Sequence, residues 1–351
     1  MGIDHILKYD GLAGRCLMAC RRDGAPVRSL WQPVSTPTEC VFPGCYISAT
    51  VRRIAPGQGG SFLEGEGGEE LFLAHSYKAR PVEGERIEVV CVSSARSDKL
   101  ARVRKIDGET MPSFETPEDA WMAGLRGDPG PPIIETLDAH MQIDAALEDL
   151  LSPTVPLPGG GRLTIAPTRA LVAVDVDTSG RNPRGNRAQN AQEINLEAVE
   201  TLARQIALRD LGGTVVLDCL GPISKARGQA LRSAFLDAFS ELSHRRVEAL
   251  IPSKFGLLEI AIAWGRQPFH DQWLDRFGTL QTSAKLWRSM RRLEIEASAR
   301  PMDRLTLELP NDVFNLFAKH SGSYMQRIEA RFGARIDVVP SSGNQTEVTP
   351  R

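Results

Sequence analysis

The stretch LVAVDVD at residues 171–177, read together with TVVLDCL at residues 214–220, decides the fold predicted for this chain. Both are short apolar runs, which are typical of strands buried in a sheet. Between them, residues 191–209 predict a helix, because apolar side chains recur on one stripe at helical spacing: Ile194, Ala198, Leu202 and Ile206. The pair Gly212-Gly213 ends that helix. The order strand, helix, strand indicates an α/β fold.

The same pattern continues on both sides of this unit. Helices are predicted at residues 134–151 and 224–240, and further strands in VEALIP and GLLEIAIA. Beyond residue 276, a helix, the strand RLTLEL and a last α/β segment indicate a small appended domain. The polar residues 340–351 are expected to form a flexible tail.

The first hundred residues carry a different, β-rich pattern. Residues 14–31 predict a hairpin around the Asp23-Gly24 turn. Between residues 41 and 106, five short strands follow one another with frequent glycine: CYISATVRRI, GGSFLEG, EELFLAH, ERIEVVCVS and LARVRKI. Five such strands in so short a stretch predict a small barrel of the OB type.

Length and composition bound the class of protein. The chain has 351 residues, of which 42% are hydrophobic and 25% charged, as expected for soluble globular domains. No run approaches the roughly 18 apolar residues of a membrane helix. The N-terminal residues do not resemble a secretory signal, so we expect a cytoplasmic protein with no membrane partner. With a net charge of −2, any polyanionic partner must be held by local patches.

Acidic residues interrupt both strands of the central unit. Asp218 lies within an otherwise buried run, where an ionised carboxylate is costly unless it is paired or binds a metal. Asp175 and Asp177 end the other strand and lie on one face of it, because side chains alternate along a strand. Carboxylate oxygens are ligands that Mg²⁺ prefers, so we expect a metal site here. The alternative is a salt-bridged core acid at Asp218 and a solvated strand end at Asp177.

Three arginines, Arg181, Arg184 and Arg187, follow directly after these acids in the loop SGRNPRGNR. Arginines in a flexible loop are suited to phosphate contacts. Beside a magnesium site they suggest phosphoryl-transfer or phosphodiester chemistry; the alternative is a solvated run of charge. The sequence has no P-loop, no G-x-G-x-x-G, no G-x-S-x-G and no H-E-x-x-H, so the corresponding sites are not indicated.

The predicted barrel has its own candidate residues. Phe62 and Phe72 occupy strand positions, and Lys99 lies on a later strand. OB-type barrels bind single strands by stacking bases on aromatic rings in a basic groove. The alternative places both phenylalanines in the barrel core.

Six cysteines are spread through the chain. Four of them form a C-x3-C and a C-x4-C pair, a spacing that admits zinc: Cys16, Cys20, Cys40 and Cys45. Because no secretory signal is recognised, reduced thiols without zinc are the expectation.

The block from residue 158 to residue 260 resembles the catalytic core of the ribonuclease E/G family. The resemblance rests on NLEA at 195–198, ARQ at 203–205, LRDLGG at 208–213 and FGLLE at 255–259, which match the family's signature in order and spacing. The barrel resembles the family's OB-like RNA-binding domain, and the C-terminal unit resembles its small domain.

The resemblance implies a mixed α/β architecture: an RNase H-like catalytic domain that is interrupted by the barrel, so that the N-terminal residues pack against it. The implied parts are residues 1–38 and 133–275 (catalytic domain), 39–107 (barrel), 108–132 (linker or remnant of a 5′-sensor), 276–339 (small domain) and 340–351 (tail). It implies that Asp175 and Asp218 hold Mg²⁺, and that Phe62, Phe72 and Lys99 contact RNA in the barrel.

The chain also departs from the family pattern. Asp177 stands where the family usually has an asparagine that orients the attacking water, so the carboxylate either takes that role or ligates a second metal ion. The 5′-sensor is not recognisable in residues 107–150, so no preference for 5′-monophosphorylated RNA is carried over. The C-P-x-C-x-G zinc link is absent, which predicts a monomer or homodimer and no zinc-linked tetramer.

Two functions follow from these observations. The first is a magnesium-dependent endoribonuclease for RNA processing or decay, which cuts single-stranded RNA such as an rRNA precursor or an mRNA and leaves 5′-phosphate and 3′-hydroxyl ends. In it, Asp177 positions water or assists the metal, and Arg181 and Arg184 bind flanking phosphates. The second is an RNA-binding protein of the same ancestry with weak or no cleavage.

Overall fold

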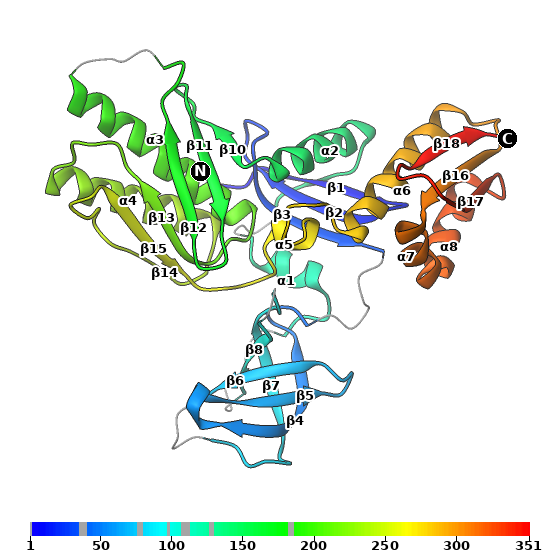
Figure 1. Ribbon diagram of the computed structural model, residues 1–351, viewed down its shortest axis with the longest axis horizontal. Helices are drawn as coiled ribbons and strands as arrows, with labels where there is room; N and C mark the ends of the chain where they lie inside the picture. The colour runs from blue at the N-terminus through cyan, green and yellow to red at the C-terminus, as the bar shows by residue number, and fades with distance from the viewer. Residues whose placement is uncertain are drawn as a thin grey trace.

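The computed structural model describes residues 2–34, 41–75, 80–96, 99–106, 113–125, 130–181 and 186–351. An N-terminal sheet occupies the centre of the molecule (Figure 1). The barrel lies below it, a six-stranded sheet with two long helices lies on the left, and the C-terminal unit lies on the right. Within the described part of the chain, no helix is long and apolar enough to cross a membrane.

The N-terminal sheet has the strand order β3-β2-β1-β9. The predicted hairpin is confirmed by β2 (Gly14–Cys20) and β3 (Pro26–Pro33), and β1 (His5–Gly11) adds a strand that the sequence analysis missed. The chain returns to this sheet after the barrel, when β9 (Ile133–Ile134) pairs in parallel with β1. The barrel is therefore an insertion into the N-terminal unit.

The predicted five-stranded barrel is confirmed. Its closed strand order is β4-β5-β6-β8-β7, and β6 and β8 form the parallel pair. The strands are β4 (Tyr46–Ala55), β5 (Gly60–Gly65), β6 (Glu70–Ala74), β7 (Arg86–Ser93) and β8 (Ala101–Lys105). Alternate residues of each strand, such as Leu63, Leu71 and Val103, fill the barrel core.

The segment between barrel and β9 is more than a linker. It contains α1 (Pro117–Ala123), which begins at the capping residue Thr116 and buries Trp121 against the N-terminal sheet. After β9, α2 (Leu137–Leu151) covers the same sheet, so the helix expected from residue 134 begins three residues later.

The six-stranded sheet follows the order β10-β11-β12-β13-β15-β14. Two helices, α3 (Arg187–Leu208) and α4 (Lys225–Leu242), pack their apolar stripes on one of its faces. The strands are β10 (Thr154–Pro156), β11 (Arg162–Pro167), β12 (Val172–Asp177), β13 (Gly213–Asp218), β14 (Val247–Ala249) and β15 (Leu257–Ile262).

The expectation of one interrupted catalytic domain needs correction. The N-terminal strands form a sheet of their own, because β1 pairs with β9 and not with a strand of the six-stranded sheet. The two units do pack together, as expected: the Ser29 hydroxyl donates to the carbonyl oxygen of Leu208 at 2.8 Å, and Arg28 donates to that of Leu242 at 3.0 Å.

The C-terminal unit has a three-stranded sheet, β17-β16-β18, next to helices. Its elements are α5 (Phe269–Trp273), α6 (Thr282–Ala299), β16 (Leu305–Pro310), α7 (Asn311–Lys319), α8 (Ser321–Phe332), β17 (Ile336–Ser341) and β18 (Glu347–Pro350). The expected flexible tail is wrong for this last segment, because it pairs with the buried strand β16 and brings Val348 opposite Leu307.

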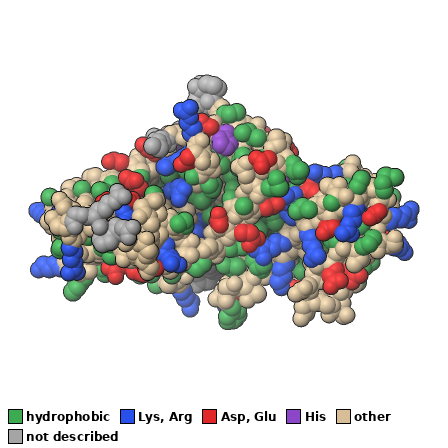
Figure 2. Space-filling model, turned by 90° about the horizontal axis from the view of Figure 1, so that it is seen from above, with side chains coloured by type: hydrophobic (Ala, Val, Ile, Leu, Met, Phe, Trp, Pro, Cys, Tyr) green, Lys and Arg blue, Asp and Glu red, His purple; other side chains and the backbone are tan. Residues whose placement is uncertain are grey.

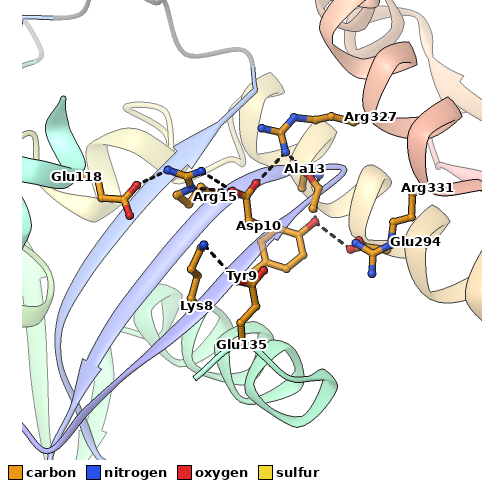
Figure 3. Close-up of polar contacts among 11 residues, drawn as sticks. Lys8, Tyr9, Asp10, Ala13, Arg15, Glu118, Glu135, Glu294, Arg327 and Arg331 are labelled. Atoms are coloured by element: carbon orange, nitrogen blue, oxygen red, sulfur yellow. Dashed lines mark hydrogen bonds and ion pairs between the residues drawn. The ribbon is translucent and has the colours of Figure 1, made fainter. Parts of the chain in front are cut away.

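A buried ionic cluster joins the C-terminal unit to the N-terminal sheet (Figure 3). The Glu294 side chain is only 3% exposed and pairs with Arg291 and Arg331, and it accepts a hydrogen bond of 2.9 Å from the Tyr9 hydroxyl. Burial raises the pKa of Tyr9, so this hydroxyl keeps its proton. Arg327 also reaches across and donates to Asp10 at 2.9 Å.

We predict that Glu294→Gln destabilises the protein by about 3 kcal/mol, because it removes a buried carboxylate charge and leaves the buried Arg291 with Asp144 as its remaining counter-ion. Chemical denaturation measures this change. Glu296→Gln on the same helix is the matched control: Glu296 is more exposed and, among the described residues, forms its one ion pair with Arg300, so we expect a loss below about 1 kcal/mol. Equal stability of the two variants would contradict the prediction.

Candidate functional site

Two aspartates lie side by side at the ends of neighbouring strands. β12 and β13 run in parallel with Val174 opposite Leu217, so the next residues in register are Asp175 and Asp218. Neighbouring strands lie about 4.8 Å apart. Both aspartates are exposed, because the alternate positions of these strands are the ones that face α3 and α4. The sequence analysis expected a buried carboxylate at Asp218; the structure places it on the open face of the sheet.

The carboxylates of Asp175 and Asp218 repel each other, and among the described residues no hydrogen bond or ion pair compensates either one. The same part of the chain contains no group of three or more His, Cys, Asp or Glu residues that could hold a metal ion. Mg²⁺ is commonly held by one or two carboxylates and completes its shell with water and substrate phosphates. Two adjacent, uncompensated carboxylates fit such an ion.

Asp177 lies two residues beyond Asp175 on β12 and therefore on the same face of the sheet. Unlike that of Asp175, its carboxylate has hydrogen-bond and ion-pair partners among the described residues. One oxygen accepts hydrogen bonds from the backbone amide of Ser179 at 2.9 Å and from its hydroxyl at 2.5 Å. The other oxygen lies 3.2 Å from Nε of Arg162. The hydrogen bonds from Ser179, with a smaller contribution from Arg162, lower the pKa of Asp177. Asp177 is therefore a fixed, ionised carboxylate beside the pair.

The backbone after Asp218 is held from two sides. The Asn195 side chain on α3 donates to the carbonyl oxygen of Leu220 and accepts from its amide, both at 2.9 Å. Cys219 donates its amide to the carbonyl oxygen of Gly256 at 3.1 Å. Asn195 is fully buried, so this double hydrogen bond is shielded from water. Asn195 belongs to the motif NLEA and Gly256 to the motif FGLLE. Both motifs therefore help to fix the end of the strand that carries Asp218.

The three arginines after the acids have different positions. Arg181 was expected to bind phosphate, but its side chain is only 6% exposed and makes two hydrogen bonds of 2.7 Å with Glu197. It also donates to the carbonyl oxygen of Gly160. Arg181 thus ties the loop before β11 to α3, which corrects the expectation. Arg187 is exposed at the first turn of α3, and Arg184 lies outside the described residues.

The barrel carries Phe62 and Phe72 on its outer face. They lie opposite each other on β5 and β6, half-buried, with ring centroids 5.5 Å apart. The register continues to Arg53 on β4 and to Arg102 on β8. The guanidinium carbon of Arg53 lies 4.4 Å from the Phe62 ring centroid. We call this row of Arg53, Phe62, Phe72 and Arg102 the barrel stripe.

The barrel stripe differs in part from the residues expected. Lys99 is exposed but precedes β8, three residues before Arg102, and lies outside the stripe. Arg102 was missed although its signal was available, since Ala101 and Val103 on either side are apolar and alternation turns Arg102 outward. Gly60 allows the ring of Phe72 to lie across it: a Cβ there would come within 2.5 Å of the ring.

Charge of both signs is mixed over the surface. On the face seen in Figure 2, Lys and Arg side chains are interspersed with Asp and Glu. This agrees with the net charge of −2 and leaves recognition of a polyanion to local groups such as the barrel stripe.

Comparisons with known proteins show which chains this sequence is similar to. Residues 131–263 match the sequence profile described as the Ribonuclease E/G family. Ribonuclease E of Escherichia coli is 29% identical over 218 residues, which are 60% of this chain and 20% of that protein. Ribonuclease E of Buchnera aphidicola subsp. Schizaphis graminum is 34% identical over 126 residues (36% and 13%). The chloroplastic Ribonuclease E/G-like protein of Arabidopsis thaliana is 36% identical over 121 residues (34% and 12%). The chain thus spans about a fifth of the E. coli relative.

We predict that Ser179→Ala raises the pKa of Asp177 toward its ordinary value of 3.8, because it removes the hydroxyl hydrogen bond, which lowers this pKa most, and keeps the bond from the backbone amide. A lowered pKa stabilises the fold above the unfolded-state pKa, and this contribution is lost as the pH falls through the folded-state pKa. As the pH falls, the variant should therefore lose the stability contributed by ionised Asp177 at a higher pH than the wild type does. Carboxyl ¹³C shifts measured against pH report the change, with the exposed helix residue Ser240→Ala as control. An unchanged titration of Asp177 would refute the assignment.

Proposed function

We propose that this chain, which belongs to the Ribonuclease E/G family through residues 131–263, is a metal-dependent endoribonuclease that cleaves single-stranded RNA. One observation carries the proposal: Asp175 and Asp218 lie in register on the open face of the family-matched sheet, and neither has a partner among the described residues. An uncovered pair of carboxylates beside an anionic substrate is unfavourable unless a cation joins them.

In the proposed mechanism, Asp175 and Asp218 would hold Mg²⁺. When bound, the ion supplies positive charge that activates water and offsets the charge developing on the scissile phosphate. Asp177 lies next to this pair with its carboxylate oriented by Ser179 and Arg162. It would accept a hydrogen bond from the attacking water and so orient it. Hydrolysis would leave a 5′-phosphate and a 3′-hydroxyl, as the family resemblance implies.

The barrel would hold the RNA strand. Phe62 and Phe72 offer two aromatic faces for stacking, and Arg53 and Arg102 bracket them with positive charge for phosphates. If both arginines pair with phosphates and the rings hold the bases by stacking alone, the stripe should bind with little sequence preference. Lys99, on the same barrel but outside the stripe, would contact RNA farther along.

We predict that Asp218→Asn lowers the rate of cleavage of a labelled single-stranded RNA in Mg²⁺ by at least about 10²-fold while binding is retained, because charge stabilisation at the phosphate is worth several kcal/mol. Asp237→Asn on α4, on the covered side of the sheet, should cleave like the wild type, and EDTA should stop cleavage by both.

Unchanged cleavage by Asp218→Asn would overturn the site assignment. Tight RNA binding by the wild type without any cleavage would instead support the second candidate, a non-cleaving RNA-binding protein. The observation that favours this candidate is Asp177, whose carboxylate is already occupied by Ser179 and Arg162.

We predict that the double variant Phe62→Ala, Phe72→Ala binds single-stranded RNA more weakly by about 2 kcal/mol or more, since each stacked base contributes roughly 1–3 kcal/mol. The variant should raise KM with little effect on kcat, because the stripe lies far from the carboxylates in sequence and on another unit. Fluorescence anisotropy gives the affinity. Tyr46→Ala, at the other end of β4 from Arg53, is the control. Equal affinities for all three proteins would refute this role of the barrel stripe.

A further inference from the structure

A tight turn at residues 253–257, between β14 and β15, lies against the proposed catalytic carboxylate. The carbonyl oxygen of Gly256 accepts the amide of Cys219 at 3.1 Å, one residue after Asp218. Gly256 has φ +88, and a Cβ at this position would lie 3.1 Å from the Cys219 carbonyl oxygen and 3.9 Å from Oδ1 of Asp218. The turn therefore borders the site at atomic contact distance.

The turn is held in one shape by its own hydrogen bonds. Ser253 and Leu257 close it, with the Ser253 amide donating to the Leu257 carbonyl oxygen at 2.9 Å. The Gly256 amide donates to the Ser253 carbonyl oxygen at 2.9 Å, and the Phe255 amide lies 3.3 Å from the Ser253 hydroxyl. Because these bonds fix the turn and its last residue, Leu257, pairs with Asp218 in the sheet, the tip residues Lys254 and Phe255 are held two to three residues along the chain from the strand partner of Asp218.

The tip presents an aromatic ring and a cation to solvent. Phe255 is 88% exposed, although full burial of such a side chain is favourable by about 1.5–3 kcal/mol. Lys254 is exposed as well, with no hydrogen bond or ion pair to the described residues. Leu250, 60% exposed, adds apolar surface on the same hairpin. An unpaired nucleotide has the complementary chemistry, a flat base and an anionic phosphate.

We propose that the Lys254–Phe255 tip is an RNA-binding subsite that holds the nucleotide next to the cleaved phosphate, with the base stacked on Phe255 and a phosphate paired with Lys254. The inference rests on the proposed function, because only the placement of Asp218 at the reacting phosphate makes this nucleotide a neighbour of the cut. The subsite belongs to the six-stranded sheet and is separate from the barrel stripe. It would fix which phosphodiester lies over the carboxylates.

The chain offers a matched control. Phe277 is 77% exposed, lies in another turn, and is also preceded by a basic residue, Arg276, whose guanidinium lies 4.7 Å from the ring centroid. This turn connects α5 to α6, outside the six-stranded sheet that carries the carboxylates. A general effect of removing an exposed phenylalanine should therefore occur in Phe277→Ala as well as in Phe255→Ala.

The test uses the full chain and a set of single-stranded RNA oligomers in which one 2-aminopurine is moved along the sequence. In Ca²⁺, chosen to prevent cleavage, stacking quenches the fluorescence at one position for the wild type. We expect Phe255→Ala and Phe255→Leu to remove that quenching, and Phe255→Trp and Phe277→Ala to retain it. In Mg²⁺, Phe255→Ala should lower kcat/KM about tenfold, the size of one stacked base. Lys254→Gln should reduce the slope of log affinity against log salt by about 0.7.

The outcomes separate this inference from the proposed function. Loss of quenching in Phe255→Ala with a wild type that never cleaves would support the subsite and overturn the nuclease. A wild type that cleaves, with Phe255→Ala equal to it in both quenching and kcat/KM, would overturn the subsite alone. Equal losses in Phe255→Ala and Phe277→Ala would also overturn it, because the effect would then not depend on the site.

Discussion

The parallel pairing of β12 with β13 is the constraint on which the proposed site depends. It places Asp175 and Asp218 in the same row of the sheet, and the helices α3 and α4 on the opposite face leave that row open. Two like charges at this spacing repel each other, so the fold tolerates them only because solvent screens them. The same repulsion is the reason for proposing that a cation binds to this row.

The rest of the molecule supports this row and adds surfaces around it. Asn195 and Gly256 hold the backbone directly after Asp218, and the turn that contains Gly256 exposes Phe255 to solvent two residues before Leu257, the strand partner of Asp218. The N-terminal sheet lies between the other units. It carries the inserted barrel, and it joins the C-terminal unit through the hydrogen bond from Tyr9 to Glu294. Because Glu294 is buried, the two units must pack so that its charge keeps its partners.

Much of the local structure was predictable from periodicity. Alternation in the barrel segment predicted five strands, and the apolar runs around Asp175 and Asp218 predicted two neighbouring strands of an α/β unit. What failed depends on contacts distant in sequence. In the sequence, Arg181 resembles a free loop arginine, because its partner Glu197 becomes its neighbour only in the folded chain. The polar C-terminal residues resemble a tail, because their pairing with the edge of β16 is also visible only in the fold. The exposure of Phe255 is likewise invisible in the motif FGLLE.

A crystal soaked in Mn²⁺, a Mg²⁺ substitute with an anomalous signal, tests most directly whether Asp175 and Asp218 jointly hold a cation. We expect an anomalous peak between these two carboxylates, within about 2.0–2.3 Å of an oxygen of each. The peak should be absent from crystals of Asp218→Asn. A peak elsewhere, or an empty site at saturating Mn²⁺ in a well-ordered wild-type crystal, would contradict joint binding.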